Sequence, residues 1–273
     1  ALGAMALATA AVPPTSAQTA TPLRLDATLW ADQLSVPALP GQFVEAEVRR
    51  PNGSRLVGFG SGGSDGRAVL DLYNAGDGRG GPTALQAGDT VRIAQSGRRP
   101  LEIVVPPLSA GIDAALDRVS GTAPAGAAVA VLAQIEQVGP DGAVLWHDVP
   151  ATAIAGSDGA WSVGFAGEGV DLPTGRTRGR AWVETTDHDR FTASFVDARL
   201  DVALGAYEVR GLVTPGRRVS GTIVRAGGES VTLPERTVTG DGAFALGTSG
   251  FGFFGPPPPN AHPLAVGDRV ELT

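Results

Sequence analysis

Hydrophobic side chains recur at every second position over many short stretches of the chain. Val44, Ala46 and Val48 alternate with polar neighbours, and the stretch 129–133 repeats the arrangement. A period of two is typical of a β-strand with one buried face. Turns rich in glycine, proline and aspartate separate these stretches, and no segment has a convincing helical period. The pattern predicts an all-β protein.

One pattern of turn and strand occurs three times. Its landmark is an Asp-Gly dipeptide, found at Asp65-Gly66, Asp158-Gly159 and Asp241-Gly242. Apolar residues stand three and five places beyond each aspartate: Ala68 and Leu70, Trp161 and Val163, Phe244 and Leu246. A Pro–Gly element precedes each landmark: Pro40-Gly41, Pro124-Ala125-Gly126 and Pro215-Gly216. Repetition at this spacing indicates a tandem array.

The first and third copies of this pattern share a second sequence motif. Residues 85–91 read LQAGDTV and residues 264–270 read LAVGDRV. The middle copy departs from this motif, because residues 172–175 read LPTG and lack the aspartate. Hairpin turns fit the same plan, since Asn52-Gly53 and Asp141-Gly142 each lie between two alternating runs.

These observations predict a tandem array of about three small antiparallel β-sandwich (Ig-like) modules. The expected division is a leader over 1–20, then modules over 21–107, 108–197 and 198–273. The third copy ends at Thr273, whereas the first continues into another strand over 101–105, so the third module is expected to lack its last strand. Two explanations stay open: a truncated sequence, or a strand donated by another chain.

Composition narrows the range of partners and chemistries. The net charge is −7 and no lysine occurs, which argues against nucleic acid and anionic membranes as partners. The absence of cysteine excludes disulfides and thiolate catalysis. Glycine (39 residues) and proline (21 residues) are abundant without a Gly-X-Y period, and with 42% apolar residues this indicates many strands joined by turns.

The first seventeen residues are apolar and small. The run ALGAMALATAAV is followed by Pro13-Pro14 and Thr15-Ser16-Ala17, as in the tail of a signal peptide. The alternative is a short alanine-rich helix. The signal-peptide interpretation predicts a secreted or cell-surface protein, and no later segment is long and apolar enough to span a bilayer.

The order VSGTAPAGAAVAV…SDGAWSV, from Val119 to Val163, resembles bacterial immunoglobulin-like and carboxypeptidase-regulatory-like β-sandwich modules, which occur in tandem in surface proteins. The resemblance covers most of residues 21–273 and rests on turn and strand signals. It implies a non-catalytic structural, adhesive or spacer role, with other surface proteins or extracellular glycans as partners. The alternative that it implies is an accessory carbohydrate-binding part of a larger secreted hydrolase. It brings no catalytic residues, and we expect the chain not to be an enzyme.

The segment 251–263 is the most suggestive candidate for ligand binding. Phe251, Phe253 and Phe254 lie on glycine hinges beside the stiff run Pro256–Pro259, and His262 follows. Such aromatics stack on sugars or dock another module. The alternative is a loop that folds over its own core and hides the phenylalanine rings.

Two acidic clusters are candidate metal sites. Asp71, Asn74 and Asp77 have a spacing that faintly resembles a calcium loop, with a plain turn as the alternative. Calcium is therefore a candidate cofactor, and no other is expected. The run Asp187-His188-Asp189 is a second candidate, although a loop explains it more simply.

Two further features have structural explanations. Gly58, Gly60 and Gly63 match the letters of a dinucleotide-binding motif, but no helix follows, which favours a flexible loop. The four tryptophans sit mostly in strand patterns, so we expect them to pack in the core: Trp30, Trp146, Trp161 and Trp182.

Overall fold

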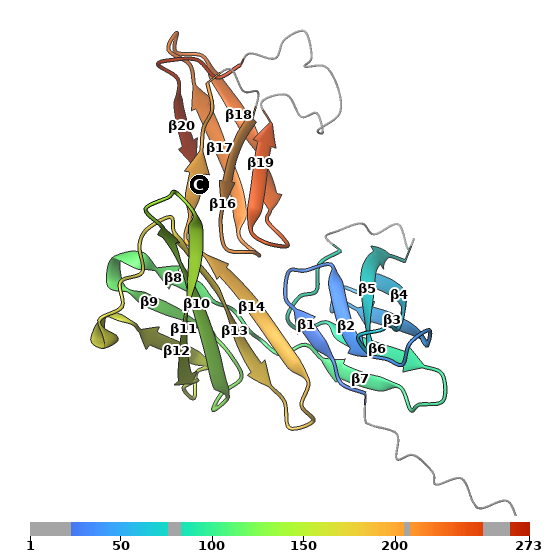
Figure 1. Ribbon diagram of the computed structural model, residues 1–273. Coiled ribbons are helices and arrows are strands. Elements are labelled where there is room, and N and C mark those ends of the chain that lie inside the picture. Colours follow the sequence, from blue (N-terminus) through green and yellow to red (C-terminus); the bar gives the residue numbers. More distant parts are fainter. Residues whose placement is uncertain (1–22, 76–82, 205–207, 248–262) are drawn as a thin grey trace, which may run out of the picture.

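The computed structural model describes residues 23–75, 83–204, 208–247 and 263–273 (Figure 1). These residues form twenty β-strands and two single-turn 3₁₀ helices, Ala114–Leu116 and Ala166–Glu168. The prediction of an all-β protein is confirmed. None of the helices in these ranges is long or apolar enough to cross a membrane.

The strands follow one another in three series. The first is β1 (Asp26–Thr28), β2 (Gln33–Pro37), β3 (Phe43–Arg49), β4 (Arg55–Ser61), β5 (Arg67–Asn74), β6 (Thr90–Gln95) and β7 (Leu101–Val104). The second is β8 (Gly111–Asp113), β9 (Arg118–Thr122), β10 (Ala128–Val138), β11 (Val144–Ile154), β12 (Ala160–Gly164), β13 (Thr177–Glu184) and β14 (Arg190–Val196). The third is β15 (Arg199–Asp201), β16 (Glu208–Leu212), β17 (Arg218–Val224), β18 (Ser230–Thr237), β19 (Ala243–Gly247) and β20 (Arg269–Leu272).

The same strand pairings recur in each series. The third strand pairs with the fourth and sixth, as in β3–β4 and β3–β6, β10–β11 and β10–β13, β17–β18 and β17–β20. The second strand pairs with the fifth, as in β2–β5, β9–β12 and β16–β19. A seventh strand pairs with the sixth in β6–β7 and β13–β14, whereas the described residues place no strand on the outer edge of β20.

One joint connects the first two series into a single eleven-stranded sheet. Strand β1 pairs in parallel with β14, with Ala27 opposite Phe191 and Thr28 opposite Thr192 (Figure 1). The amide of Leu29 donates to the carbonyl of Thr192 at 2.8 Å. The amide of Arg190 donates to the carbonyl of Leu25, also at 2.8 Å. Strand β1 therefore pairs with the edge of β14 that faces away from β13.

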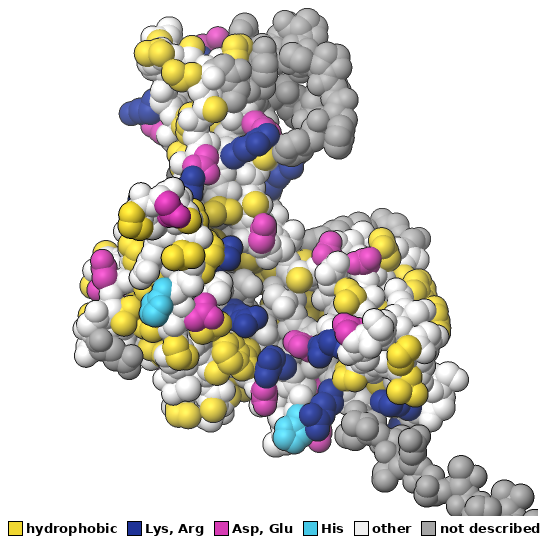
Figure 2. All heavy atoms as spheres, viewed as in Figure 1, with side chains coloured by type: hydrophobic (Ala, Val, Ile, Leu, Met, Phe, Trp, Pro, Cys, Tyr) yellow, Lys and Arg dark blue, Asp and Glu magenta, His cyan; other side chains and the backbone are white. Residues whose placement is uncertain are grey.

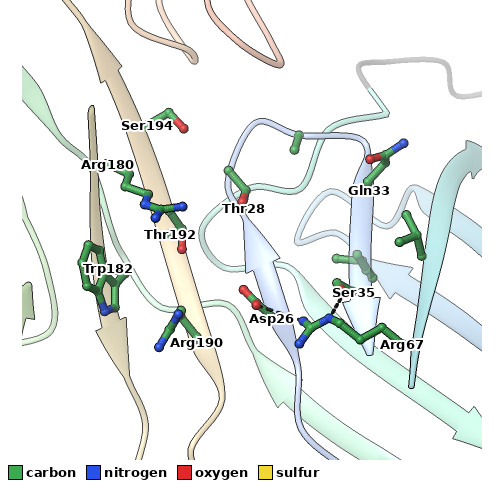
Figure 3. A pocket seen from close by; sticks show the side chains of 13 residues that line it. Asp26, Thr28, Gln33, Ser35, Arg67, Arg180, Trp182, Arg190, Thr192 and Ser194 are labelled. Atoms are coloured by element: carbon green, nitrogen blue, oxygen red, sulfur yellow. Dashed lines mark hydrogen bonds and ion pairs between the residues drawn. The ribbon is translucent and has the colours of Figure 1, made fainter. Parts of the chain in front are cut away.

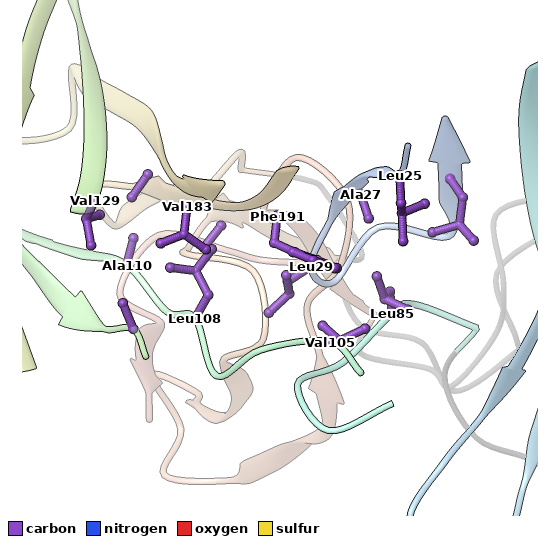
Figure 4. Close-up of a cluster of buried hydrophobic side chains, with 14 of the residues drawn as sticks. Leu25, Ala27, Leu29, Leu85, Val105, Leu108, Ala110, Val129, Val183 and Phe191 are labelled. Atoms are coloured by element: carbon purple, nitrogen blue, oxygen red, sulfur yellow. The ribbon is translucent and has the colours of Figure 1, made fainter. Parts of the chain in front are cut away.

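The hydrophobic core follows the sheet across this joint. Leu25, Ala27 and Leu29 are each 1% exposed and belong to one continuous cluster with Phe191 (Figure 4). The cluster reaches from Leu23 to Phe195 and includes buried residues of both series. The predicted alternation is confirmed at Val44, Ala46 and Val48, which are fully buried.

The third series has its own smaller core, built around residues such as Val209, Ile223 and Leu246. Packing and hydrogen bonds join it to the rest of the described chain, and the ring of Trp30 lies close against Gly216. The amide of Gly240 donates to the carbonyl of Trp30 at 2.9 Å. The hydroxyl of Thr214 accepts from the amide of Val196 at 3.2 Å and donates to its carbonyl at 3.0 Å.

The three Asp-Gly landmarks and the turn at Asp141-Gly142 are of one kind. In each, the aspartate carboxylate accepts the amide two residues ahead at 3.0–3.2 Å: Asp65, Asp141, Asp158 and Asp241. The glycine that follows has φ between 78° and 90°, a left-handed conformation that only glycine adopts freely. The hairpin predicted at Asp141-Gly142 is confirmed by the pairing of β10 with β11, and the one at Asn52-Gly53 by the pairing of β3 with β4.

The LxxGD motif also forms a turn, and its hydrogen bonds explain why the middle series lacks the aspartate. Asp89 accepts the amide of Gln86 at 2.8 Å, and Asp268 accepts the amide of Ala265 at 3.0 Å. Pro173 stands at the corresponding position of the middle series and has no amide to satisfy. An aspartate is therefore unnecessary there.

Two expectations about side chains were wrong. Gly58 and Gly60 lie within strand β4 and not in a flexible loop. Glycine is required there because a Cβ at either position would press on β5. Trp161 is buried in the core, but Trp146 is 38% exposed beneath the guanidinium of Arg178, and Trp182 is half-buried on the outer face of the sheet. Trp182 alternates with buried neighbours and so points away from the core.

Candidate functional site

A groove of about 510 Å³ lies on the outer face of the sheet, across the joint between β1 and β14 (Figure 3). Five neighbouring strands supply its lining: β13, β14, β1, β2 and β5. Side chains at every second position of a strand share a face, so residues 180 and 182, and 190, 192 and 194, all project into it. Figure 2 shows dark-blue and magenta side chains along the hollow between the two lower lobes.

The lining combines charge, hydroxyls and one aromatic ring. Three arginines and one aspartate face the groove, within a chain whose net charge is −7: Arg67, Arg180, Arg190 and Asp26. The uncharged polar side chains are Thr28, Gln33, Ser35, Thr192 and Ser194. Trp182 supplies the ring, with the guanidinium of Arg180 5.9 Å and that of Arg190 5.7 Å from its centre. Both distances are within the range of cation–π attraction.

On the β2–β5 side, an ion-pair network fixes the lining. Arg67 reaches the carboxylate of Asp26 at 3.0 Å and donates to the hydroxyl of Ser35 at 2.8 Å (Figure 3). On the β13–β14 side, Arg190 pairs with Glu184 at 2.8 Å. This hydrogen bond and the charge of Arg190 lower the pKa of Glu184. Both pairs are partly exposed, so each orients side chains more than it stabilises the fold.

Asp189, just before β14, joins that strand to the residue that precedes β1. The residue is 1% exposed, and its carboxylate accepts the amide of Leu25 at 2.6 Å. Burial raises the pKa of Asp189, and the negative charge of Asp187 raises it further. The residue therefore fixes the approach of β1 to β14.

The structure places the predicted site residues in different ways. Phe251, Phe253, Phe254 and His262 lie outside the described residues, and the ligand-binding hypothesis for them stays a prediction. Asp71 and Asn74 stand three positions apart on β5 and so project from opposite faces. Asp77 lies outside the described residues, and the calcium prediction is left untested.

The second acidic cluster is a turn between β13 and β14. His188 has a left-handed φ of 65°, and its amide donates to the carbonyl of Thr185 at 2.9 Å. Within the described ranges, no three His, Asp or Glu side chains gather closely enough to hold a metal ion. The loop explanation for this cluster fits the geometry.

Sequence reasoning did not identify the groove. Its residues come from positions 26–69 and 180–194, and their proximity depends on the β1–β14 pairing, which leaves no local signal. One signal was present: Arg180, Trp182 and Glu184 alternate with apolar residues, which places them on the polar face of a strand.

Comparisons with known proteins give little further guidance. No family model matches the chain, and no curated protein matches it. A solved tetra-tandem repeat from the extending region of a large adhesion protein aligns over 83% of this chain and 66% of its own, with 19% identity and a TM-score of 0.23. E. coli alpha-2-macroglobulin aligns over 84% of this chain and 21% of its own (9% identity, TM-score 0.22). A 1.5-MDa bacterial ice-binding adhesin aligns over 82% and 85% (15% identity, TM-score 0.19).

The chain thus spans 66% and 21% of the first two of these structures. Each of the three structures aligns with more than four fifths of this chain, and each TM-score is below 0.25.

Proposed function

We propose that this chain is a non-catalytic, load-bearing segment of a structural or adhesive protein that works outside the cell. It consists of three Ig-like sandwich modules, over 21–107, 108–197 and 198–273. The threefold recurrence of strand pairings supports this division. The signal-peptide-like residues 1–17 support export.

The observation that carries the proposal is the parallel pairing of β1 with β14. Tension along the chain pulls β1 from its N-terminal end and β14 from its C-terminal end. Because the strands run in the same direction, this tension slides one strand along the other and loads the hydrogen bonds between them together. A hairpin pulled at its open end instead loses its bonds one after another.

Side-chain packing reinforces the joint. Leu25, Ala27 and Leu29 are buried against the core that contains Phe191, so sliding β1 would also expose apolar surface (Figure 4). The carboxylate of Asp189 adds a buried hydrogen bond at the end of β1. The residues that lie between β1 and β14 in the sequence bear no tension while these two strands stay paired.

Single-molecule force spectroscopy in two directions tests this proposal. The chain has no native cysteine, so pairs of introduced thiols can serve as handles. Handles at Arg24→Cys and Ala198→Cys shear the joint. Handles at Arg24→Cys and His188→Cys pull the same two strands from the same end and peel them apart. All three positions are exposed.

We expect a rupture force several times higher in the shearing direction, since forced unfolding follows the unfolding rate along the pulled coordinate. Equal rupture forces in the two directions would remove the basis for a load-bearing role. Circular dichroism of both cysteine variants checks that the β-structure is intact before pulling.

A further inference from the structure

Arg180 gives the groove a positive charge. Among the described residues no acidic side chain forms an ion pair with its guanidinium, which lies 5.9 Å from the centre of the Trp182 ring. Arg67 and Arg190 are already paired with Asp26 and Glu184. An anion that enters the groove thus meets one free guanidinium with two orienting arginines nearby (Figure 3).

The surroundings of Arg180 suit a sugar better than a simple ion. Trp182 is half-buried and lines the groove between Arg180 and Arg190, so part of a flat apolar ring faces the groove beside two guanidiniums. Thr28, Thr192 and Ser194 place hydroxyls along the neighbouring strands, within the same hollow (Figure 3). Hydroxyl groups both donate and accept, as the hydroxyls of a sugar require.

We infer that the groove binds an acidic saccharide, with a uronate carboxylate at Arg180 and a sugar ring against Trp182. This inference deepens the adhesive role proposed above by naming the chemical class of its ligand. The volume of about 510 Å³ accommodates a short segment of two or three sugar units and not a folded protein domain.

The placement of the groove across the joint gives the ligand a mechanical consequence. Its contacts come from β13 and β14 on one side and from β1, β2 and β5 on the other. A ligand that touches both sides binds the joined state and not the separated one. Binding therefore stabilises the joint according to mass action.

Isothermal titration calorimetry with three matched probes tests the inference. Trigalacturonate carries carboxylates on a sugar backbone, maltotriose is a neutral sugar of the same length, and triglutamate carries carboxylates without sugar rings. We expect trigalacturonate to bind and the other two to bind at least about tenfold more weakly, because a charge-assisted hydrogen bond and ring stacking both contribute. Added salt should weaken trigalacturonate binding.

A second Arg–Trp pair on the same sheet supplies matched controls. Arg178 lies 3.9 Å from the ring of Trp146, outside the groove. We expect Arg180→Gln and Trp182→Ala each to weaken trigalacturonate binding about tenfold or more. Arg178→Gln and Trp146→Ala should leave it within about twofold, since neither residue lines the groove.

Each other result overturns the inference in a distinct way. If trigalacturonate does not bind, the whole inference is wrong. If maltotriose binds equally well, the ligand need not be anionic, and if triglutamate binds equally well, it need not be a saccharide. Equal losses in the groove and control variants place the ligand elsewhere. The force measurement uses no ligand. A negative calorimetry result therefore leaves the load-bearing proposal intact, and a negative force result leaves the saccharide inference intact.

Discussion

The carboxylate of Asp189 is held away from water where β1 meets β14. Asp189→Ala leaves the buried amide of Leu25 without an acceptor. We expect a loss of about 1–3 kcal/mol in the free energy of unfolding, measured by urea denaturation. Asp189→Asn keeps an oxygen in place and should cost less. Equal stability of the alanine variant and the wild type would show that the bond contributes nothing.

The same residue predicts a pH dependence. Burial raises the pKa of Asp189, so the folded chain binds its proton more tightly than the unfolded chain. The stability that this proton provides is present at low pH and is lost as pH rises from about 4 through the raised pKa. Asp189→Asn has no carboxyl group to titrate. Its free energy of unfolding should therefore rise relative to that of the wild type over that pH range. A difference that stays constant with pH contradicts the prediction.

At the scale of elements, the Asp-Gly turns provide a matched pair of substitutions. Gly142 and Gly159 have φ of 80° and 79°, but a Cβ on Gly142 meets open space, whereas one on Gly159 lies 2.7 Å from the carbonyl oxygen of Ala123. Gly142→Ala should cost about 1–2 kcal/mol for the left-handed conformation alone. Gly159→Ala should cost clearly more. Equal losses by urea denaturation would mean that the turn shifts to relieve the contact.

Local elements were predictable from the sequence because their causes are local. Alternation located strands such as β3 and β10, and the Asp-Gly dipeptides located their turns, since a turn needs specific residues at specific places. The departure at Pro173 is equally local, although only the structure showed that the missing aspartate had no amide to accept.

The β1–β14 joint and the groove could not be predicted in the same way. Strand β1 is three residues long, and nothing in Asp26–Thr28 specifies a parallel partner in another series. The size and apolar character of Trp182 favour the core, but its parity on the strand places it on the outer face. The acidic neighbours of Asp189 favour a metal site, whereas its carboxylate accepts the amide of Leu25 just before β1.

At the scale of the whole molecule, the two cores predict two unfolding units. All four tryptophans lie between Trp30 and Trp182, within the part built on the larger core. Phe191→Ala should lower the midpoint of the fluorescence transition, with a loss of about 3–5 kcal/mol. Ile223→Ala, in the smaller core, should shift a transition seen by circular dichroism and leave the fluorescence midpoint nearly unchanged. A fluorescence shift as large for Ile223→Ala would mean that the chain unfolds as one unit.

The pairing of the first strand with the fourteenth also determines when the chain can finish folding. Leu25 and Asp189 are 164 positions apart, so nearly every other strand of the larger core must be synthesised before β1 finds its partner. Contacts between distant positions slow folding, because the loop must close before they form. Until β14 has been synthesised, the apolar side chains of Leu25 and Leu29 lack the strand beside which they pack, and β1 is exposed to pairing with a wrong strand.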